Sequence, residues 1–209
     1  MLILSNTSLD YLDMKRSHPQ FFLRPSQVVA KFKQPVFYFQ RERTPSNQFI
    51  MYARPANWQY DEHLLADTLA TLIPFVECET LLNKASAGKG PVVLVDMTGW
   101  TYTHFSKIRK FDLEFIMDIA EKLSPAKPGP VHVFNVISSV TAVYKMLKPF
   151  LSERLSRDMY LYSSDELPKL YDIIPKSQLP KELGGECDLR KFCDSELKTY
   201  DQLLVDNHY

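Results

Sequence analysis

Residues 131–185 decide the fold of this 209-residue chain; their sequence is VHVFNVISSVTAVYKMLKPFLSERLSRDMYLYSSDELPKLYDIIPKSQLPKELGG. Residues 131–137 form a short, mostly apolar run, which is typical of a strand buried on both faces of a sheet. Residues 138–147 have the pattern of a helix, and Pro149 ends it because a proline cannot continue the backbone hydrogen bonds. The stretch therefore begins as a strand followed by a helix.

The second half of the stretch repeats this order. A second strand is expected over residues 158–163, and a short amphipathic helix over residues 165–179. A Leu-Pro pair and a double glycine, within residues 179–185, then close the unit, because proline and glycine are the strongest local breakers of regular structure.

Three more strands complete the sheet. Residues 35–40 and 48–53 are rich in aromatic and β-branched side chains, and the turn-forming residues between them predict a hairpin-like antiparallel pair. Residues 92–96 (VVLVD) form another buried strand. Strands that alternate with helices predict an α/β fold whose sheet is mixed, mostly parallel and flanked by helices.

Helices are expected in three further places. Residues 8–18 are compatible with a helix that ends before Pro19. A long helix is expected over residues 61–84, with the aspartate at its start as the cap and a kink at Pro74. Apolar residues at helical spacing over residues 111–123 predict one more helix.

Composition and charge exclude several classes of protein. The chain has 25 basic and 25 acidic residues, so no global field attracts nucleic acid. The N-terminus lacks the basic flank of a secretory signal, and no window has the ~18 apolar residues of a transmembrane helix. The three cysteines have no CxxC spacing, which is typical of reduced thiols. We therefore expect a soluble, cytoplasmic, monomeric protein with one main domain.

No strong catalytic or metal-binding pattern is present in the sequence. The glycine-containing loop at residues 84–90 precedes a strand, whereas a phosphate-binding loop follows one. There is no GxSxG nucleophile elbow. The serines at 138–139 have only His132 nearby, and this histidine lies on a predicted strand, where packing decides its position. Cys187 and Cys193 have no histidine within ligand spacing. We therefore predict that the protein is not an enzyme and carries no cofactor or metal.

The segment VDMTGWTYTH is the most informative loop. Asp96 ends a buried strand, where α/β proteins usually place ligand-binding groups. The alternative is structural: Asp96 accepts hydrogen bonds from loop amides, Gly99 permits a tight turn and Trp100 fills the core. We favour the structural role for Asp96 and Trp100, and both roles stay open for Tyr102 and His104.

Four short motifs occur in a definite order along the chain. They are Asn57-Trp58, Asp96-x-x-Gly99-Trp100-x-Tyr102-Thr103-His104, Lys148-Pro149-Phe150-Leu151 and Leu179-Pro180-x-x-Leu183-Gly184-Gly185. In order and spacing, from about residue 20 to residue 185, they resemble the CRAL-TRIO lipid-binding family.

The resemblance implies a lipid-binding domain over residues 25–209, in which the sheet is the floor of an apolar pocket closed by a gate helix. Residues 1–24 would be a remnant of the family's N-terminal helical lobe, so we expect a short form or a fragment. The gate would be residues 165–179. Its inward-facing side chains would be Leu167, Leu170, Tyr171 and Ile174, and so few apolar anchors suit an element that opens.

The function that the resemblance implies is binding and transfer of a small hydrophobic lipid, with peripheral contact to anionic membranes. Two positions limit the chemical class of ligand that we expect. Family members that bind phosphatidylinositol hold its head group with a Glu and a Lys, and these positions are Ala126 and Asp158 here. A buried phosphate without a cationic partner would be costly. A neutral, tocopherol- or retinoid-like ligand is therefore favoured over a phospholipid.

The candidate site residues form two sets. The expected pocket wall and gate comprise Tyr102, His104, Phe115, Ile119, Val133, Asn135, Ile137, Val140, Tyr144, Leu147, Leu151, Leu155, Leu167, Leu170 and Ile174. The expected membrane-contacting cations are Lys145, Lys148, Arg154, Arg157, Lys169 and Lys176. Each such cation contributes about 1 kcal/mol near an anionic surface. A simple solvated face is the alternative for these cations, because acidic residues are interleaved with them.

Two other functions stay open. One is a phospholipid- or phosphoinositide-binding domain. The other is a protein-interaction module that keeps the fold without a working cavity, in which aromatic side chains would fill the interior.

Overall fold

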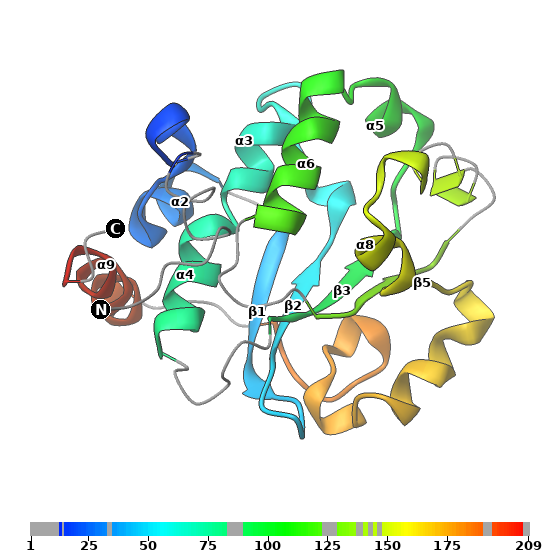
Figure 1. Ribbon diagram of the computed structural model, residues 1–209. Coiled ribbons are helices and arrows are strands. Elements are labelled where there is room, and N and C mark those ends of the chain that lie inside the picture. Colours follow the sequence, from blue (N-terminus) through cyan, green and yellow to red (C-terminus); the bar gives the residue numbers. More distant parts are fainter. Residues whose placement is uncertain are drawn as a thin grey trace.

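The computed structural model describes residues 13, 15–32, 35–82, 90–122, 129–136, 140–141, 144–145, 148–189 and 194–206. These residues form one five-stranded sheet with the strand order β1-β2-β3-β4-β5 (Figure 1). The strands are β1 (Phe37–Arg43), β2 (Phe49–Ala53), β3 (Val92–Asp96), β4 (Val131–Phe134) and β5 (Met159–Leu161). Strands β1 and β2 are antiparallel and the other neighbours are parallel, which confirms the predicted mixed, mostly parallel sheet.

Helices of α and 3-10 type connect the strands. The α-helices are α2 (Pro25–Lys31), α3 (Leu65–Ala70), α4 (Ile73–Leu82), α5 (Tyr102–Ser106), α6 (Lys110–Lys122), α8 (Glu153–Arg157) and α9 (Asp194–Asp206). The 3-10 helices are η1 (Pro19–Phe21), η2 (Pro55–Asn57), η4 (Lys148–Phe150), η5 (Ser164–Asp172), η6 (Lys176–Gln178) and η7 (Lys181–Leu183).

The helix expected over residues 61–84 is instead two helices, α3 and α4. The first begins after Leu64 rather than at Asp61. Pro74 lies in the first turn of α4, where a missing N–H is tolerated, whereas inside one long helix it would leave the Ala70 carbonyl without its donor. Thr71 also donates its hydroxyl to the Thr68 carbonyl at 2.6 Å, in competition with helical bonds.

The two faces of the sheet are covered by different parts of the chain. On one face, here called the helix-side face, Phe39, Phe49 and Met51 pack against α4 and α9. On the other, here called the wrapped face, Ile50, Leu94 and other side chains pack against residues 167–183. Figure 1 shows α3, α4 and α6 on one side of the sheet and the yellow-to-orange segment that contains η5 to η7 on the other.

The segment that covers the wrapped face is closed by the double glycine. Gly184 has a φ of 72°, a left-handed conformation that favours glycine. A Cβ on Gly185 would lie 2.1 Å from the Leu179 carbonyl oxygen, so no side chain fits there. Both glycines are therefore needed where the chain closes tightly against Leu179.

Helices α2 and α9 cover the outer side of α4. Leu197, Tyr200 and Leu204 of α9 are buried in the same cluster as Val28 of α2. Tyr200 also donates its hydroxyl to the buried Glu79 carboxylate at 2.7 Å. The expected helices over residues 111–123 and 165–179 have counterparts in α6 and in η5 and η6, whereas α2 and α9 were not predicted from the sequence.

Candidate functional site

An aliphatic surface lies on the helix-side face of β3, β4 and β5. The strand register places these side chains in pairs on neighbouring strands. They are Val93, Val95, Val131, Val133, Met159 and Leu161. All but Val133 are only partly buried, whereas Val92, Leu94 and Phe134 on the wrapped face are buried. In the described part of the chain, this half of the helix-side face is thus only partly covered by other residues, and no polar side chain lies among the six apolar ones.

The predicted pocket residues that the structure describes have different surroundings, and Ile119 shares a cluster with the floor residue Val93. Phe115 of α6 is buried against Phe21, and Ile119 packs on the same helix-side cluster as Val93. Leu155 is buried on α8, which packs beside β5. Val140, Tyr144 and Leu151 are partly buried, as are Ile119, Asn135 and Leu167 of the same set. Ile137 and Leu147 lie outside the described residues.

Residues 165–179 do not face this floor. Leu170 and Ile174 are buried at 0% and 1% exposure in the cluster on the wrapped face, and Leu167 packs against the same cluster. Their inward direction agrees with the sequence pattern, and the expected short amphipathic helix is formed by two 3-10 helices, η5 and η6. Because these side chains and Phe115, Ile119 and Val133 are on opposite faces of the sheet, they do not line one pocket. Two of the four predicted inward-facing side chains, Leu170 and Ile174, are thus fully buried, while Leu167 and Tyr171 are partly buried.

Tyr102 and His104 lie away from the floor, at the first turn of α5. The side chain of Tyr102 is 77% exposed. His104 is buried and stacks on Trp100, with ring centroids 4.8 Å apart. The His104 Nδ1 accepts a hydrogen bond from the Thr101 backbone N–H, so this histidine closes the N-terminus of α5.

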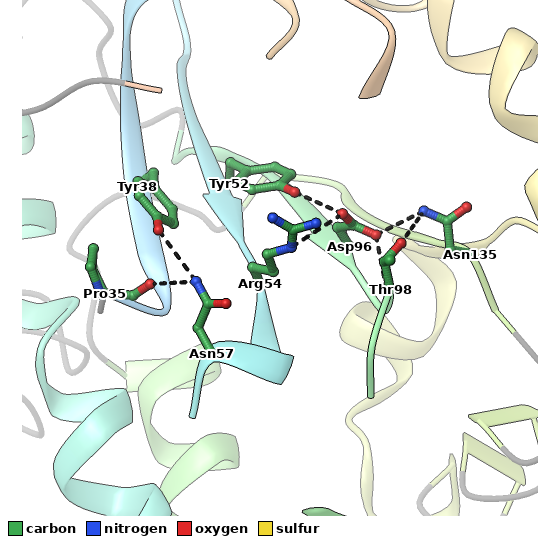
Figure 2. Close-up of polar contacts among 8 residues, drawn as sticks. All are labelled: Pro35, Tyr38, Tyr52, Arg54, Asn57, Asp96, Thr98 and Asn135. Atoms are coloured by element: carbon green, nitrogen blue, oxygen red, sulfur yellow. Dashed lines mark hydrogen bonds and ion pairs between the residues drawn. The ribbon is translucent and has the colours of Figure 1, made fainter. Parts of the chain in front are cut away.

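A polar cluster lies at the carboxyl ends of β2, β3 and β4 (Figure 2). Its centre is Asp96, at 1% exposure. The carboxylate accepts hydrogen bonds from the Tyr52 hydroxyl at 2.8 Å, the Thr98 N–H at 3.0 Å and the Asn135 amide at 2.7 Å. The Arg54 Nε lies 3.8 Å away. The predicted role of Asp96 in holding loop amides is confirmed, and Gly99 adopts a φ of 81° as the turn requires.

The hydrogen bonds decide the charge of this cluster. Burial alone would raise the pKa of the Asp96 carboxyl, but the bonds from Thr98, Asn135 and Tyr52 outweigh burial and hold its pKa below the ordinary value. Burial, and then the neighbouring Asp96 charge, raise the pKa of Tyr52. The site therefore holds a carboxylate beside a neutral phenol that donates to it, an arrangement that orders the sheet edge.

In the structure, neither His132 nor Cys187 has the surroundings of a catalytic or metal-binding residue. His132 is buried on the wrapped face, and burial lowers its pKa to about 4, so its ring is neutral near pH 7. Cys187 is partly buried and donates to the Ser177 carbonyl. Within the described ranges, no group of three His, Cys, Asp or Glu side chains is arranged to hold a metal ion.

The candidate membrane-contacting cations differ in their surroundings. Lys169 is bound to Glu166 at 2.5 Å, Arg157 to Asp158 at 3.1 Å, and Lys176 lies over the Tyr171 ring. Arg154 is partly buried on α8. Lys145 and Lys148 are exposed, and neither forms an ion pair in the part of the chain that the structure describes. None of the described helices is long and apolar enough to span a membrane.

Comparison with known proteins agrees with this architecture. The family model for the CRAL/TRIO domain matches residues 33–185. The chain belongs to the CRAL-TRIO family. Members of this family bind and transfer small lipophilic ligands and are generally not enzymes.

Individual CRAL-TRIO relatives are distant. The human alpha-tocopherol transfer protein-like protein is 25% identical over 179 residues, which cover 85% of this chain and 52% of that protein. Rat clavesin-2 is 25% identical over 160 residues, or 77% of this chain and 47% of that protein. The chain thus spans about half the length of the curated relatives it matches. The crystal structure of Sfh5 superposes with a TM-score of 0.59 at 12% identity, over 92% of this chain and 74% of that one, which shows a shared fold.

Proposed function

We propose that the protein binds one small, neutral hydrophobic lipid against the helix-side face of β3, β4 and β5 and transfers it between membranes. The observation that supports this proposal is the partly buried aliphatic floor. Apolar side chains left partly exposed gain about 2.5 kcal/mol for each 100 Å² that a ligand removes from water. A lipid on this floor would complete the burial that the wrapped face already has.

The charges near the floor favour a neutral ligand. All six floor side chains are aliphatic. At its amino end, Asp158 is already held by the Arg157 side chain at 3.1 Å. A phosphate placed beside this pair would meet a carboxylate, and an anion without a cationic partner is costly to bury. The tocopherol- or retinoid-like class of ligand therefore fits better than a phospholipid.

Membrane contact is the second part of the proposal. Lys145 and Lys148 are exposed and lie in the chain between β4 and β5, the middle strand and the edge strand of the floor. Cations near an anionic lipid surface each contribute about 1 kcal/mol to binding. These two lysines are therefore the cations that we expect to contact a membrane during lipid transfer, and the protein would work in the cytoplasm.

Native mass spectrometry of protein purified from a eukaryotic host tests the proposal. We expect one bound lipid per chain, and uptake of added tocopherol or retinol when the protein has been stripped. Val95→Trp should abolish uptake, because the indole would occupy the floor. Tyr160→Trp is the matched control, on β5 but on the opposite face, and should bind normally. A folded protein that takes up no lipid, or a Val95→Trp variant that binds as well as the wild type, would contradict the proposal.

A further inference from the structure

The side-chain amide of Asn135 is held in one orientation. Its Nδ2 donates both of its N–H groups, one to Asp96 Oδ1 at 2.7 Å and one to Thr98 Oγ1 at 3.0 Å (Figure 2). The opposite orientation would place the Asn135 oxygen against the Asp96 carboxylate, two acceptors facing each other. The hydrogen-bond network therefore assigns the amide orientation without ambiguity.

The backbone also fixes this residue. Asn135 has a φ of 56°, a left-handed conformation that asparagine tolerates better than most residues. The chain next to it is fixed too, because the Val136 N–H donates to the Tyr162 carbonyl at 3.1 Å. Both the backbone and the side chain of Asn135 are thus set before any ligand arrives.

The result is an acceptor that points away from the cluster. Figure 2 shows the Asn135 Oδ1 on the side opposite to Asp96 and Thr98. This oxygen accepts no hydrogen bond from the described part of the chain, and the residue is partly exposed. It lies at the carboxyl edge of the sheet, two residues beyond Val133 of the aliphatic floor. The floor offers no polar group of its own, so a polar group on a bound lipid has to be recognised at its edge.

We propose that the Asn135 Oδ1 is the polar specificity determinant of the lipid site and selects a lipid that carries a hydroxyl donor, an alcohol or a phenol. The inference rests on the lipid-binding function proposed above and deepens it. An ester or ether of the same lipid has only acceptors and would leave Oδ1 unpaired. A carboxylate or phosphate would in addition meet the negative Asp96 behind the amide.

Matched ligand pairs test this inference. The probes are retinol with retinyl acetate, and α-tocopherol with α-tocopheryl acetate, titrated against stripped full-length protein by quenching of tryptophan fluorescence. The wild type should bind each alcohol about 10-fold more tightly than its acetate, the value of one well-formed hydrogen bond. Asn135→Gly permits the left-handed backbone and removes the acceptor, so the preference should fall to about 1.

A second asparagine provides the control. Asn47, in the turn between β1 and β2, has a φ of 64°, so Asn47→Gly makes the same change at a comparable conformation elsewhere. It should keep the full preference for the alcohols. A merely structural role of Asn135 would weaken the alcohol and the acetate equally, and that result would overturn the inference. Equal binding of both members of each pair by the wild type would do so as well, while leaving lipid binding intact. Absence of binding for all four probes would instead overturn the proposed function together with this inference.

Discussion

Glu77 should make the stability of the protein fall as the pH rises. Its side chain, on α4, is 8% exposed, and its Oε1 is buried without a hydrogen-bond partner among the described residues. The Lys15 Nζ lies 4.0 Å from Oε1, which is too far for a hydrogen bond. Burial therefore raises the pKa of Glu77 to about 8 from an ordinary value of 4.5. Replacing this residue with glutamine removes the titration while keeping the shape.

The sign and size of the effect follow from proton linkage. Between pH 4.5 and about 8, Glu77 holds a proton in the folded protein that it releases in the unfolded chain. The contribution of this proton to the free energy of unfolding is therefore fully present below pH 4.5 and decreases as the pH rises to about 8. At 1.36 kcal/mol per pH unit, this interval corresponds to at most about 5 kcal/mol. Local relaxation around the carboxylate lowers that figure, so we expect a loss of about 2–5 kcal/mol for the wild type relative to Glu77→Gln.

Urea denaturation of both proteins at pH 5 and pH 8.5 measures this difference. At pH 5 the free energies of unfolding of the wild type and Glu77→Gln should differ only slightly. At pH 8.5 the glutamine variant should be clearly more stable than the wild type. Glu79→Gln, on the same helix, is the control. Its carboxylate accepts from both Arg43 and Tyr200, so the variant should be less stable than the wild type at both pH values. A difference between wild type and Glu77→Gln that does not change with pH would refute the reasoning.

Two further predictions concern the wrapped face and the membrane. Leu170→Ala should lower the free energy of unfolding, measured in urea, by about 2–5 kcal/mol, because Leu170 is fully buried. Leu167→Ala, the control, should lower it clearly less. A near-neutral Leu170→Ala would instead indicate that residues 165–179 are loosely packed, as expected of a gate. The pair Lys145→Glu and Lys148→Glu should reduce flotation with anionic liposomes by at least ~10-fold, since two cations near the surface contribute about 2 kcal/mol. The pair Lys169→Glu and Lys176→Glu is the control and should have a smaller effect, and the reverse order would place the membrane contact at the wrapped face.

Much of the sheet could be predicted because its signals are local. The aromatic and β-branched runs of β1 and β2, and the apolar run of β3, are patterns within a few residues. The burial of Leu170 and Ile174 also follows from spacing along the chain. Spacing says which side of a segment is buried, however, and not which face of the sheet it covers.

The rest of the candidate site depends on contacts between distant residues. The bond between Tyr52 and Asp96 joins positions 44 residues apart, and Asn135 reaches the same carboxylate across 39. Such pairings follow from strand order and register, which no short motif encodes. The exposure of Tyr102 has a similar cause, because it depends on the direction in which the five-residue α5 leaves the sheet. One signal was available for the cluster: Tyr52 and Asp96 each lie at the carboxyl end of a predicted strand.

Photo-crosslinking with a diazirine-bearing lipid tests the central claim most directly, because it records which face of the sheet the lipid touches. After irradiation and proteolysis, we expect mass spectrometry to find labels on Val93, Val95, Met159 or Leu161 of the floor and on Ile119 of α6. Labels concentrated on Leu167, Leu170 and Ile174 would contradict the account, because they would place the lipid between the wrapped face and residues 165–179.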